Sequence, residues 1–451
     1  MRAFEAFEKI ENEPSKKGKE DLLKQYDCDA LRTLLHLTYN PFLTYRVNQL
    51  EWPEQFAPFQ PDVTQELETT LRKLAEHTTR PSVAKGMLRS IMAKCTESGA
   101  NWVARIVKRD LKIGISDKTI NKVFPGLVPV FNVQLAHPMV DKAKGTDRWD
   151  EVQYPVVVEE KFDGMRIITV CDGERVQYFS REGHELDLHV FDKQVLSLRP
   201  GTAFVLDGEG IGIGDEPCPR CAVAVKAFKA GKPWVFQQGL SMIRSQDKYT
   251  DAEMRLHVGL KIWDLLGHDF FLSQGAGSSN LPLSRRKMQL RALFEREDRN
   301  TPNIQMVKNY VAQSKQDVID LFNHFRGLGG EGVVVKDMQA PYEFKRSSAV
   351  LKLKQFHTAD LRVLDCLPGT PDSKYAGCLG TLLVGDDQGV TGKVMGGFDD
   401  DQRVEFWLRH LRGEMVGAIV EVSYMEVTPD NSLRHATFVR EREDKNACSW
   451  H

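Results

Sequence analysis

The first residues in this sequence whose types and spacing could perform chemistry surround a lysine that directly follows an apolar strand. They read Glu159-Glu160-Lys161-Phe162-Asp163-Gly164-Met165-Arg166. A lysine attacks as a nucleophile only when it is neutral, and desolvation or cationic neighbours lower its pKa toward that state. The end of a buried strand beside a tight glycine turn provides such a position. Taken alone, the octapeptide would ordinarily be interpreted as a surface lysine in a strand–turn.

The familiar phosphate-loop and metalloprotease motifs do not occur. There is no GxxxxGK[ST] loop, and the alternating glycines between Gly208 and Gly214 miss the GxGxxG spacing. His184-Glu185 is followed by His189, one residue too far for HExxH. Cys218-Pro219-Arg220-Cys221 has no second CxxC within reach, so it favours a loop with two incidental thiols over a zinc site.

Six further elements follow the lysine cluster in a fixed order. They are Ser180-Arg181, Leu206-Asp207-Gly208-Glu209, Lys261-Ile262-Trp263-Asp264-Leu265, Glu331-Gly332-Val333-Val334-Val335-Lys336, Leu351-Lys352-Leu353-Lys354 and Arg442-Glu443-Asp444-Lys445. With Lys-x-Asp-Gly-x-Arg at Lys161, this series resembles the covalent nucleotidyltransferases: DNA ligases, RNA ligases and mRNA capping enzymes. The Arg-x-Asp-Lys ending resembles the motif of ligases and capping enzymes, and the segment around Gly114 resembles the helical DNA-binding domain of T-even-phage-type and eukaryotic replicative DNA ligases; together they favour an ATP-dependent DNA ligase of the T-even-phage type.

The resemblance implies a lysyl–AMP intermediate on Lys161, formed from ATP with release of pyrophosphate. It implies that backbone groups at Glu159 read adenine, that Trp263 stacks on it, and that Arg166 and Arg181 contact ribose and phosphate. Trp263 departs mildly from the usual Phe or Tyr, although its larger ring could still stack.

The resemblance also assigns the charged residues around the phosphates. Glu209 and Glu331 would hold ribose or Mg²⁺, for which Mn²⁺ could substitute, since hard cations favour carboxylate oxygens. Charge that develops on the α-phosphate would be neutralised by lysines, and the pyrophosphate would be oriented by the C-terminal motif. The lysines are Lys336, Lys352 and Lys354, and the C-terminal residues are Arg442 and Lys445, whose geometry Asp444 would fix.

The helical N-terminal stretch carries a local excess of positive charge. Residues 71–122 contain twelve Lys and Arg against four Asp and Glu, although the whole chain has a net charge of −2. A solvated helical surface would have the same composition, but the family resemblance favours contact with DNA phosphates. The expected DNA-binding residues are Arg109, Lys112, Gly114, Lys118 and Lys122.

These residues must be positioned by more than one domain, because 451 residues exceed a single hydrophobic core. Apolar spacing of three and four predicts helices in residues 1–133. Short β-rich runs between helices predict an α+β domain of mostly antiparallel sheets in 134–355, and the resemblance implies that this is the adenylation domain. Strands separated by Gly and Asp turns predict an OB-fold barrel in 356–451. Within the middle domain, residues 214–249 match the family least, and Lys226, Lys229, Lys232 and Arg244 favour a loop on the DNA side.

The composition allows a cytosolic enzyme. No apolar run approaches the roughly 18 residues of a membrane span, and the charged N-terminus lacks a signal peptide. We therefore expect a monomeric DNA ligase in the cytoplasm, or the host cytoplasm if a phage encodes it, that seals 5′-phosphate/3′-hydroxyl nicks in duplex DNA during replication, repair and recombination. The alternatives are an RNA ligase or a GTP-using capping enzyme and, from another class, a non-catalytic nucleic-acid-binding protein.

Overall fold

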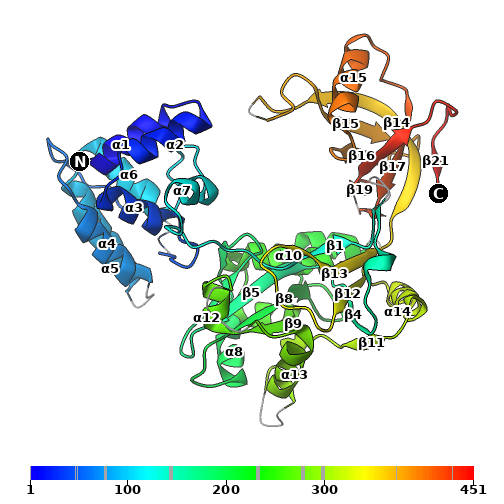
Figure 1. Ribbon diagram of the computed structural model, residues 1–451, viewed down its shortest axis with the longest axis horizontal. Helices are drawn as coiled ribbons and strands as arrows, with labels where there is room; N and C mark the ends of the chain where they lie inside the picture. Colours follow the sequence, from blue (N-terminus) through cyan, green and yellow to red (C-terminus); the bar gives the residue numbers. More distant parts are fainter. Residues whose placement is uncertain are drawn as a thin grey trace. The chain divides into compact units, whose positions relative to one another are not determined.

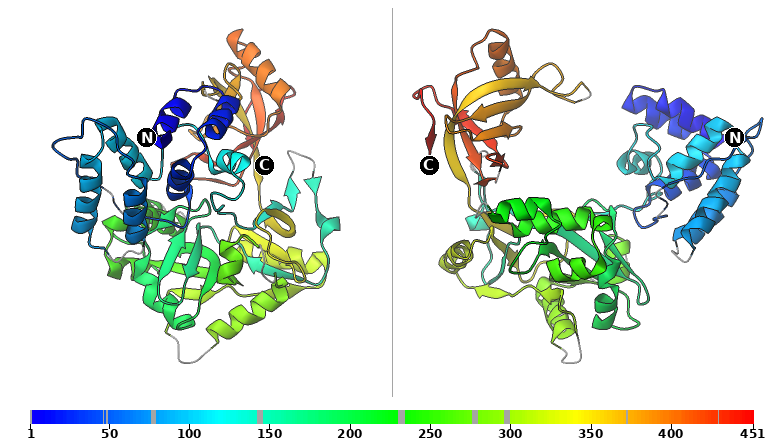
Figure 2. Two further views of the ribbon diagram at one scale, coloured as in Figure 1. Left: turned by 60° about the vertical axis from the view of Figure 1, so that its left-hand side comes forward. Right: turned by 180° about the vertical axis from the view of Figure 1, so that it is seen from behind.

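The structure is a computed structural model that describes residues 2–45, 47, 49–75, 79–141, 146–229, 234–275, 280–295, 300–371, 373–428 and 430–451. The chain divides into two compact units. Figures 1 and 2 show the helices of its N-terminal part, the sheets of its middle part and the strands of its C-terminal part. Unit 1 contains Met1–Asn132, Phe179–Glu185 and Asp269–Ser278, and unit 2 contains Val133–Tyr178, Leu186–His268 and Ser279–His451. No helix of the described part is both long and apolar enough to cross a membrane.

Helices build the N-terminal part of unit 1, as the apolar spacing predicts. In one of them Leu31, Leu34 and Leu35 share one buried face at i, i+3 and i+4. Ser15, Thr96 and Ser116 accept backbone hydrogen bonds as N-caps, which sets where three of the helices begin. The helices are α1 (Arg2–Glu11), α2 (Lys16–Gln25), α3 (Asp29–Tyr39), α4 (Thr64–Ala75), α5 (Pro81–Ala93), α6 (Glu97–Val107) and α7 (Asp117–Val123).

An aromatic cluster joins distant parts of the sequence within unit 1. The ring of Phe131 lies 5.3 Å from that of Phe179 and 5.4 Å from that of Phe271, between ring centroids. Phe42 contacts the same three rings at 5.8–6.4 Å. The segments around Phe179 and Phe271 are therefore held against the helical part of the unit.

Two mainly antiparallel sheets form the middle of the chain. The order is β1-β13-β12-β4-β11 in one and β10-β9-β8-β5-β6-β7 in the other, and only the pairs β1–β13 and β10–β9 are parallel among the described pairings of these sheets. The strands are β1 (Leu135–Pro138), β4 (Val156–Glu160), β5 (Met165–Cys171), β6 (Val176–Phe179), β7 (Glu185–Leu186), β8 (Phe204–Gly212), β9 (Val258–Leu266), β10 (Ile304–Met306), β11 (Tyr310–Ala312), β12 (Gly332–Asp337) and β13 (Arg346–Lys354); a small pair is β2 (Val140–Asp141) with β3 (Thr146–Asp147).

Helices accompany these sheets, and they include the segment expected to be a loop. Residues 214–249 contain α9 (Ala222–Lys229) and α10 (Val235–Arg244), so the expectation of a loop was wrong; Lys232 lies outside the described residues. The alternating glycines of β8 explain how α10 packs there, because Gly239 of α10 faces Gly212 so closely that an added Cβ would lie 2.4 Å from the Gly212 nitrogen. The other helices are α8 (Asp192–Leu198), α11 (Asp251–His257), α12 (His268–Leu272), α13 (Leu283–Phe294) and α14 (Lys315–Gly327), with 3₁₀ turns η2 (Trp149–Glu151), η3 (His189–Phe191) and η4 (Gln246–Lys248).

The C-terminal part is a small barrel, as its strand spacing predicts. Its sheet has the order β16-β15-β14-β17-β20, and a bridge from Gly396 to Thr437 joins its two edges. The strands are β14 (His357–Pro368), β15 (Leu379–Gly385), β16 (Thr391–Val394), β17 (Ile419–Tyr424), β20 (Thr437–Glu441) and β21 (Ser449–Trp450), with the hairpin β18 (Glu426–Val427) and β19 (Leu433–Arg434) and one helix, α15 (Asp400–Leu411). The sequence reading did not anticipate α15, although Asp399 and Gln402 form its capping box.

Candidate active site

Three strands bring Lys161, Glu331 and Lys354 together. β12 lies between β4 and β13, with Val333 opposite Glu160 and Gly332 opposite Lys354, so residues at the ends of all three strands meet. The Lys161 backbone N–H donates to the Gly332 carbonyl at 2.9 Å. One Glu331 oxygen forms an ion pair with the Lys161 ammonium and the other with the Lys354 ammonium. A single carboxylate thus holds two lysines in a largely buried position.

The pKa values in this cluster follow from burial and from the crowded positive charge. Burial, then the neighbouring Lys354 and Lys161 ammoniums, lowers the pKa of Lys352 to about 8. Burial and Lys161 also lower the pKa of Lys354. For Glu331, burial acts to raise the pKa, but Lys161 and Lys354 outweigh it and lower it. Three lysines around one carboxylate suit a site that receives a polyphosphate.

Glu209 is a second acid beside Lys161. It lies on β8 opposite Arg166 of β5, and burial raises its pKa to about 7 against the opposing effect of Lys161 and Arg166. Glu209 and Glu331 could supply two oxygen ligands to a divalent cation, and the described residues contain no group of three or more His, Cys, Asp or Glu side chains placed to hold one. A cation here would need its other ligands from substrate oxygens and water.

Arg166 has protein partners for most of its donors. Its Nε donates to Asp207 Oδ1 at 2.9 Å and its Nη2 to Oδ2 at 2.5 Å, while Nη1 donates to the Gln134 carbonyl at 2.6 Å. The Tyr342 hydroxyl donates to Asp207 Oδ2 at 2.9 Å. Asp207 and Tyr342 outweigh the burial of Arg166 and raise its pKa. Its guanidinium is fixed beside the Trp263 ring, 5.5 Å from the centroid.

The Glu159 carboxylate is buried between two lysines. Lys336 Nζ lies 2.6 Å from Glu159 Oε2, and Lys287 of α13 forms an ion pair with Oε1. Lys287 Nζ also donates to the Trp263 carbonyl at 2.5 Å. The sequence reading did not include Lys287, and no local motif marks it, because Glu159 lies 128 residues away.

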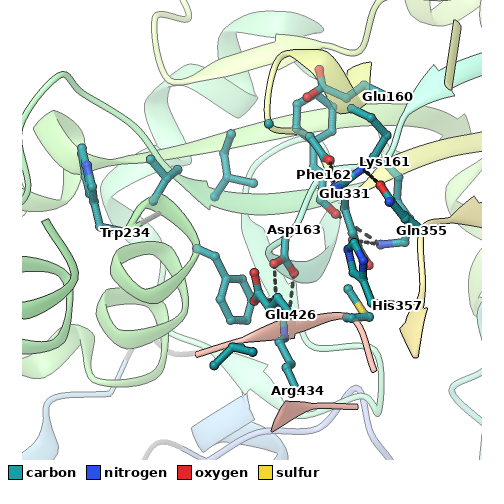
Figure 3. A pocket seen from close by; sticks show the side chains of 18 of the residues that line it. Glu160, Lys161, Phe162, Asp163, Trp234, Glu331, Gln355, His357, Glu426 and Arg434 are labelled. Atoms are coloured by element: carbon teal, nitrogen blue, oxygen red, sulfur yellow. Dashed lines mark hydrogen bonds and ion pairs between the residues drawn. The ribbon is translucent and has the colours of Figure 1, made fainter. Parts of the chain in front are cut away.

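Lys161 opens onto a pocket of about 590 Å³ (Figure 3). Its lining includes Glu331 and Asp163 from the middle of the chain and Arg434 from β19. Arg434 Nη2 donates to Asp163 Oδ1 at 2.8 Å, and Arg434 Nη1 also contacts Glu426 at 2.9 Å. Lys161 and Glu331 therefore face this pocket, whereas Arg166, Glu209, Trp263, Lys336, Lys352 and Lys354 are not among its lining residues.

Arg442 and Lys445 do not line this pocket. Both ion-pair with Asp360, a fully buried residue of β14 that the sequence reading did not identify. Asp444 holds Arg442 through two bonds of 2.9 and 2.8 Å, in keeping with a positioning role. Hydrogen bonds from Lys445, His451 and Ser449, with the charge of Arg442, lower the pKa of Asp360 to about 2 even though burial opposes this.

Arg181 and the five expected DNA-binding residues all belong to unit 1. Arg181 is half exposed, and its Nε lies 3.9 Å from Glu182. Lys112 and Lys118 are exposed, Lys122 contacts Glu20 at 2.5 Å, and Gly114 has φ +67°, which favours glycine. Arg109 is partly buried, and its Nη2 donates to the Asn40 carbonyl at 2.8 Å.

The CxxC pair is part of the core. Cys218 and Cys221 are 0% and 1% exposed and pack in the hydrophobic cluster beneath β8 and β9. All eight cysteines of the chain are free thiols.

Comparison with known proteins gives the class of each part of the chain. The family model described as "ATP dependent DNA ligase domain" matches residues 134–354, "DNA ligase OB-like domain" matches 372–442, and "DNA ligase N terminus" matches 36–125. The chain thus has a helical N-terminal region, a central nucleotidyltransferase domain and a C-terminal OB-like domain.

Curated relatives agree with this class. The DNA ligase of Thermococcus fumicolans is 26% identical over 82% of this chain and 67% of its own length, and that of Enterobacteria phage T4 is 22% identical over 80% and 77%. DNA ligase 2 of Haloquadratum walsbyi is 28% identical over 71% of this chain, which spans only 52% of that relative. A solved structure titled Pmar-Lig_PreS3 shares the fold, with a TM-score of 0.62 at 24% identity over 98% of this chain and 99% of that one. The chain belongs to the ATP-dependent DNA ligase family.

Proposed function

We propose that this enzyme seals nicks between a 5′-phosphate and a 3′-hydroxyl in duplex DNA through a covalent lysyl–AMP on Lys161. The observation that carries the proposal is the placement of Lys161 directly after β4, where it shares the Glu331 carboxylate with Lys354. The Glu331 carboxylate lies close enough to accept the proton of the attacking amine. The neighbouring lysine ammonium could neutralise the charge of a phosphate.

In the first step Lys161 Nζ attacks the α-phosphorus of ATP. A P–N bond forms, the bond to the bridging oxygen breaks, and pyrophosphate leaves while the amine loses its proton. Lys352, Lys354 and Lys336 would neutralise the charge that develops on the phosphate. In the next steps AMP passes to the 5′-phosphate of the nick, and the 3′-hydroxyl then displaces AMP.

The nucleotide would be held by the residues around Trp263. The base would stack on the Trp263 ring and contact the backbone at Glu159, while Arg166 and Arg181 would contact ribose and phosphate. Because Arg166 already bonds to Asp207, its contribution would be a fixed orientation and one positive charge. Arg442 and Lys445 would orient the pyrophosphate, which requires them to exchange Asp360 for it.

Glu209 and Glu331 would hold Mg²⁺, which would supply positive charge to neutralise the phosphates. The raised pKa of Glu209 means that a bound cation would also keep this acid ionised.

The partners would be ATP and nicked duplex DNA, and the enzyme would act as a monomer in replication, repair and recombination. Exposed Lys112, Lys118 and Lys122 in unit 1 would contact phosphates, with Gly114 allowing backbone approach. Arg109 would act from a partly buried position. The cytoplasmic location and the domain limits at 133/134 and 355/356 stay predictions.

Nick sealing with purified protein tests this proposal. A duplex with one 5′-labelled nick, ATP and Mg²⁺ should yield the sealed strand with wild type and none with Lys161→Ala. Sealing by Lys161→Ala would contradict the role of Lys161. If wild type joined only RNA ends, the enzyme would be an RNA ligase instead.

A further inference from the structure

The hairpin β18–β19 of the C-terminal barrel contacts the central domain at the pocket that Lys161 faces (Figure 3). Arg434 of β19 donates through Nη1 to one oxygen of Asp163 at 2.5 Å and through Nη2 to the other at 2.8 Å. Asp163 follows Lys161 by two residues. Within the hairpin, Arg434 lies opposite Glu426 and also donates to it at 2.9 Å. One guanidinium therefore joins the barrel to the lysine motif.

A third contact of Arg434 comes from helix α10. The Arg434 guanidinium lies over the ring of Phe236, with its Cζ 4.1 Å from the ring centroid. The face of an aromatic ring attracts a cation, and it also restricts the plane of the guanidinium. Because Glu426 and Asp163 both attract Arg434, the orientation of the guanidinium decides which carboxylate receives two of its nitrogens. In the orientation over the Phe236 ring, that carboxylate is Asp163.

The Phe236 ring is carried by a helix whose position is fixed by backbone contacts. An added Cβ on Gly212 of β8 would lie 2.3 Å from the Val235 carbonyl oxygen, and one on Gly239 would lie 2.4 Å from the Gly212 nitrogen. These two contacts flank Phe236 in the sequence of α10. The strand β8 also carries Glu209. Phe236 therefore belongs to the framework of the candidate active site, whereas its partner Arg434 belongs to the barrel.

A further contact between the hairpin and the central domain is more exposed. Lys226 of α9 forms an ion pair with Asp430 in the hairpin loop, and the two side chains are 67% and 69% exposed. Exposed pairs contribute little, because water and salt screen their charges. The Arg434 and Asp163 side chains are only 18% and 28% exposed. The contact through Arg434 is therefore the one expected to hold the hairpin in place.

This position of the hairpin suits the DNA steps of the reaction better than the ATP step. Arg442 and Lys445, which the proposed function assigns to pyrophosphate, do not line the pocket and bind Asp360 instead. Attack on ATP would need both residues at the pocket, so the barrel would have to leave its present position for that step. Transfer of AMP to DNA and joining of the strands involve no pyrophosphate, so they can proceed with the hairpin where it is.

We propose that Phe236 is a positioning residue for strand sealing: its ring orients Arg434 toward Asp163 and so holds the hairpin β18–β19 at the pocket after ATP has reacted. This inference rests on the proposed function. Phe236 needs no contact with nucleotide or DNA for this role. Sealing should therefore depend on the Phe236 ring, whereas the attack of Lys161 on ATP should not.

The test measures the two stages separately with AMP-free full-length protein. The first measurement is the rate of enzyme–AMP formation from ATP, and the second is single-turnover sealing of a nicked duplex by preformed enzyme–AMP without free ATP. Phe236→Leu keeps an apolar side chain but removes the ring face, so we expect sealing to slow about tenfold and enzyme–AMP formation to stay within about twofold of wild type. Phe236→Tyr keeps the ring face and should seal as wild type does.

Two controls connect the effect to Arg434. Phe228→Ala removes an exposed ring of α9 that contacts Trp234, and it should seal at the wild-type rate. In an Arg434→Gln background, Phe236→Leu should slow sealing no further, since the ring would have no cation to orient. A purely structural role of Phe236 would instead give additive losses.

Three results would overturn the inference: sealing by Phe236→Leu at the wild-type rate, equal slowing of enzyme–AMP formation and sealing in that variant, or additive losses in the double variant. The proposed function is judged separately on wild type. If wild type forms no enzyme–AMP or seals no nick, the proposed function fails. If wild type does both, the comparison of the Phe236 variants decides the role of Phe236 alone.

Discussion

Glu209 and Glu331 lie beside the same lysine but have opposite electrostatic settings. Glu331 contacts two ammoniums, and its pKa is lowered despite burial. Glu209 forms no ion pair of this kind within the described residues, and burial raises its pKa to about 7. Near neutral pH one acid is therefore ionised, and the other is poised to exchange its proton for a cation.

This difference predicts a pH-dependent effect of Glu209→Gln on stability. Because the pKa of Glu209 is raised on folding from 4.5 to about 7, the folded protein binds the extra proton, and stability falls as pH rises from 4.5 to 7. At pH 8 the substitution should stabilise the metal-free protein, by on the order of 2 kcal/mol after allowance for partial exposure. The gain should shrink toward pH 5.

Thermal unfolding of wild type and Glu209→Gln at pH 5 and pH 8 measures this effect. An equal change in Tm at both pH values would contradict the raised pKa. Glu182→Gln, an exposed acid, serves as the control and should change neither value.

At the scale of elements, helix α10 packs closely against strand β8 near the candidate active site. An added Cβ on Gly239 would lie 2.4 Å from the Gly212 nitrogen and 2.7 Å from the Ile211 carbonyl carbon, both backbone atoms that cannot move aside cheaply. Gly86 in α5 is also a helical glycine, but nothing lies within 4 Å of its Cβ position. Replacement by alanine should therefore destabilise the protein at Gly239 and stabilise it at Gly86.

We expect Gly239→Ala to destabilise the protein by about 1–3 kcal/mol through overpacking. Gly86→Ala should stabilise it by about 0.5–1 kcal/mol, because alanine loses less backbone entropy in a helix. Denaturant unfolding of the two variants compares them directly. Stabilisation by Gly239→Ala would show that α10 does not lie this close to β8.

Features that are marked by local sequence patterns could be predicted from the sequence. Features that depend on contacts between distant segments could not. Local patterns sufficed for the helical N-terminus, the strand before Lys161 and the barrel. The α10 helix was missed because its contact with β8 depends on facing glycines from two segments. Lys287 and Asp360 were missed for the same reason, since their partners lie far away in sequence and neither residue belongs to a motif.

At the scale of the whole molecule, the proposed contact with nicked DNA would depend on where the positive charge of unit 1 is unopposed. Several cations of the basic stretch are paired: Arg72 with Glu68, Lys94 with Glu66 and Arg105 with Glu11. Lys118 is exposed near the start of α7. DNA binding should therefore depend on fewer residues than the twelve Lys and Arg of residues 71–122.

We expect Lys118→Gln to weaken binding to nicked DNA and to reduce the slope of log affinity against log salt by about 1, because one phosphate contact is lost. Lys24→Gln, which removes a charge paired with Asp21 at 3.6 Å, should leave the slope unchanged. Binding titrations at several salt concentrations measure both. Equal slopes for wild type and Lys118→Gln would exclude Lys118 from the DNA contact.

In the proposed reaction, Lys161 carries AMP between ATP and DNA. Its most direct test is transfer of label from α-³²P-ATP to AMP-free protein, followed by addition of unlabelled nicked DNA. We expect label on the Lys161 peptide of wild type, its passage to the DNA 5′-phosphate, and no labelling of Lys161→Ala. Label on another residue, or equal labelling of Lys161→Ala, would contradict it.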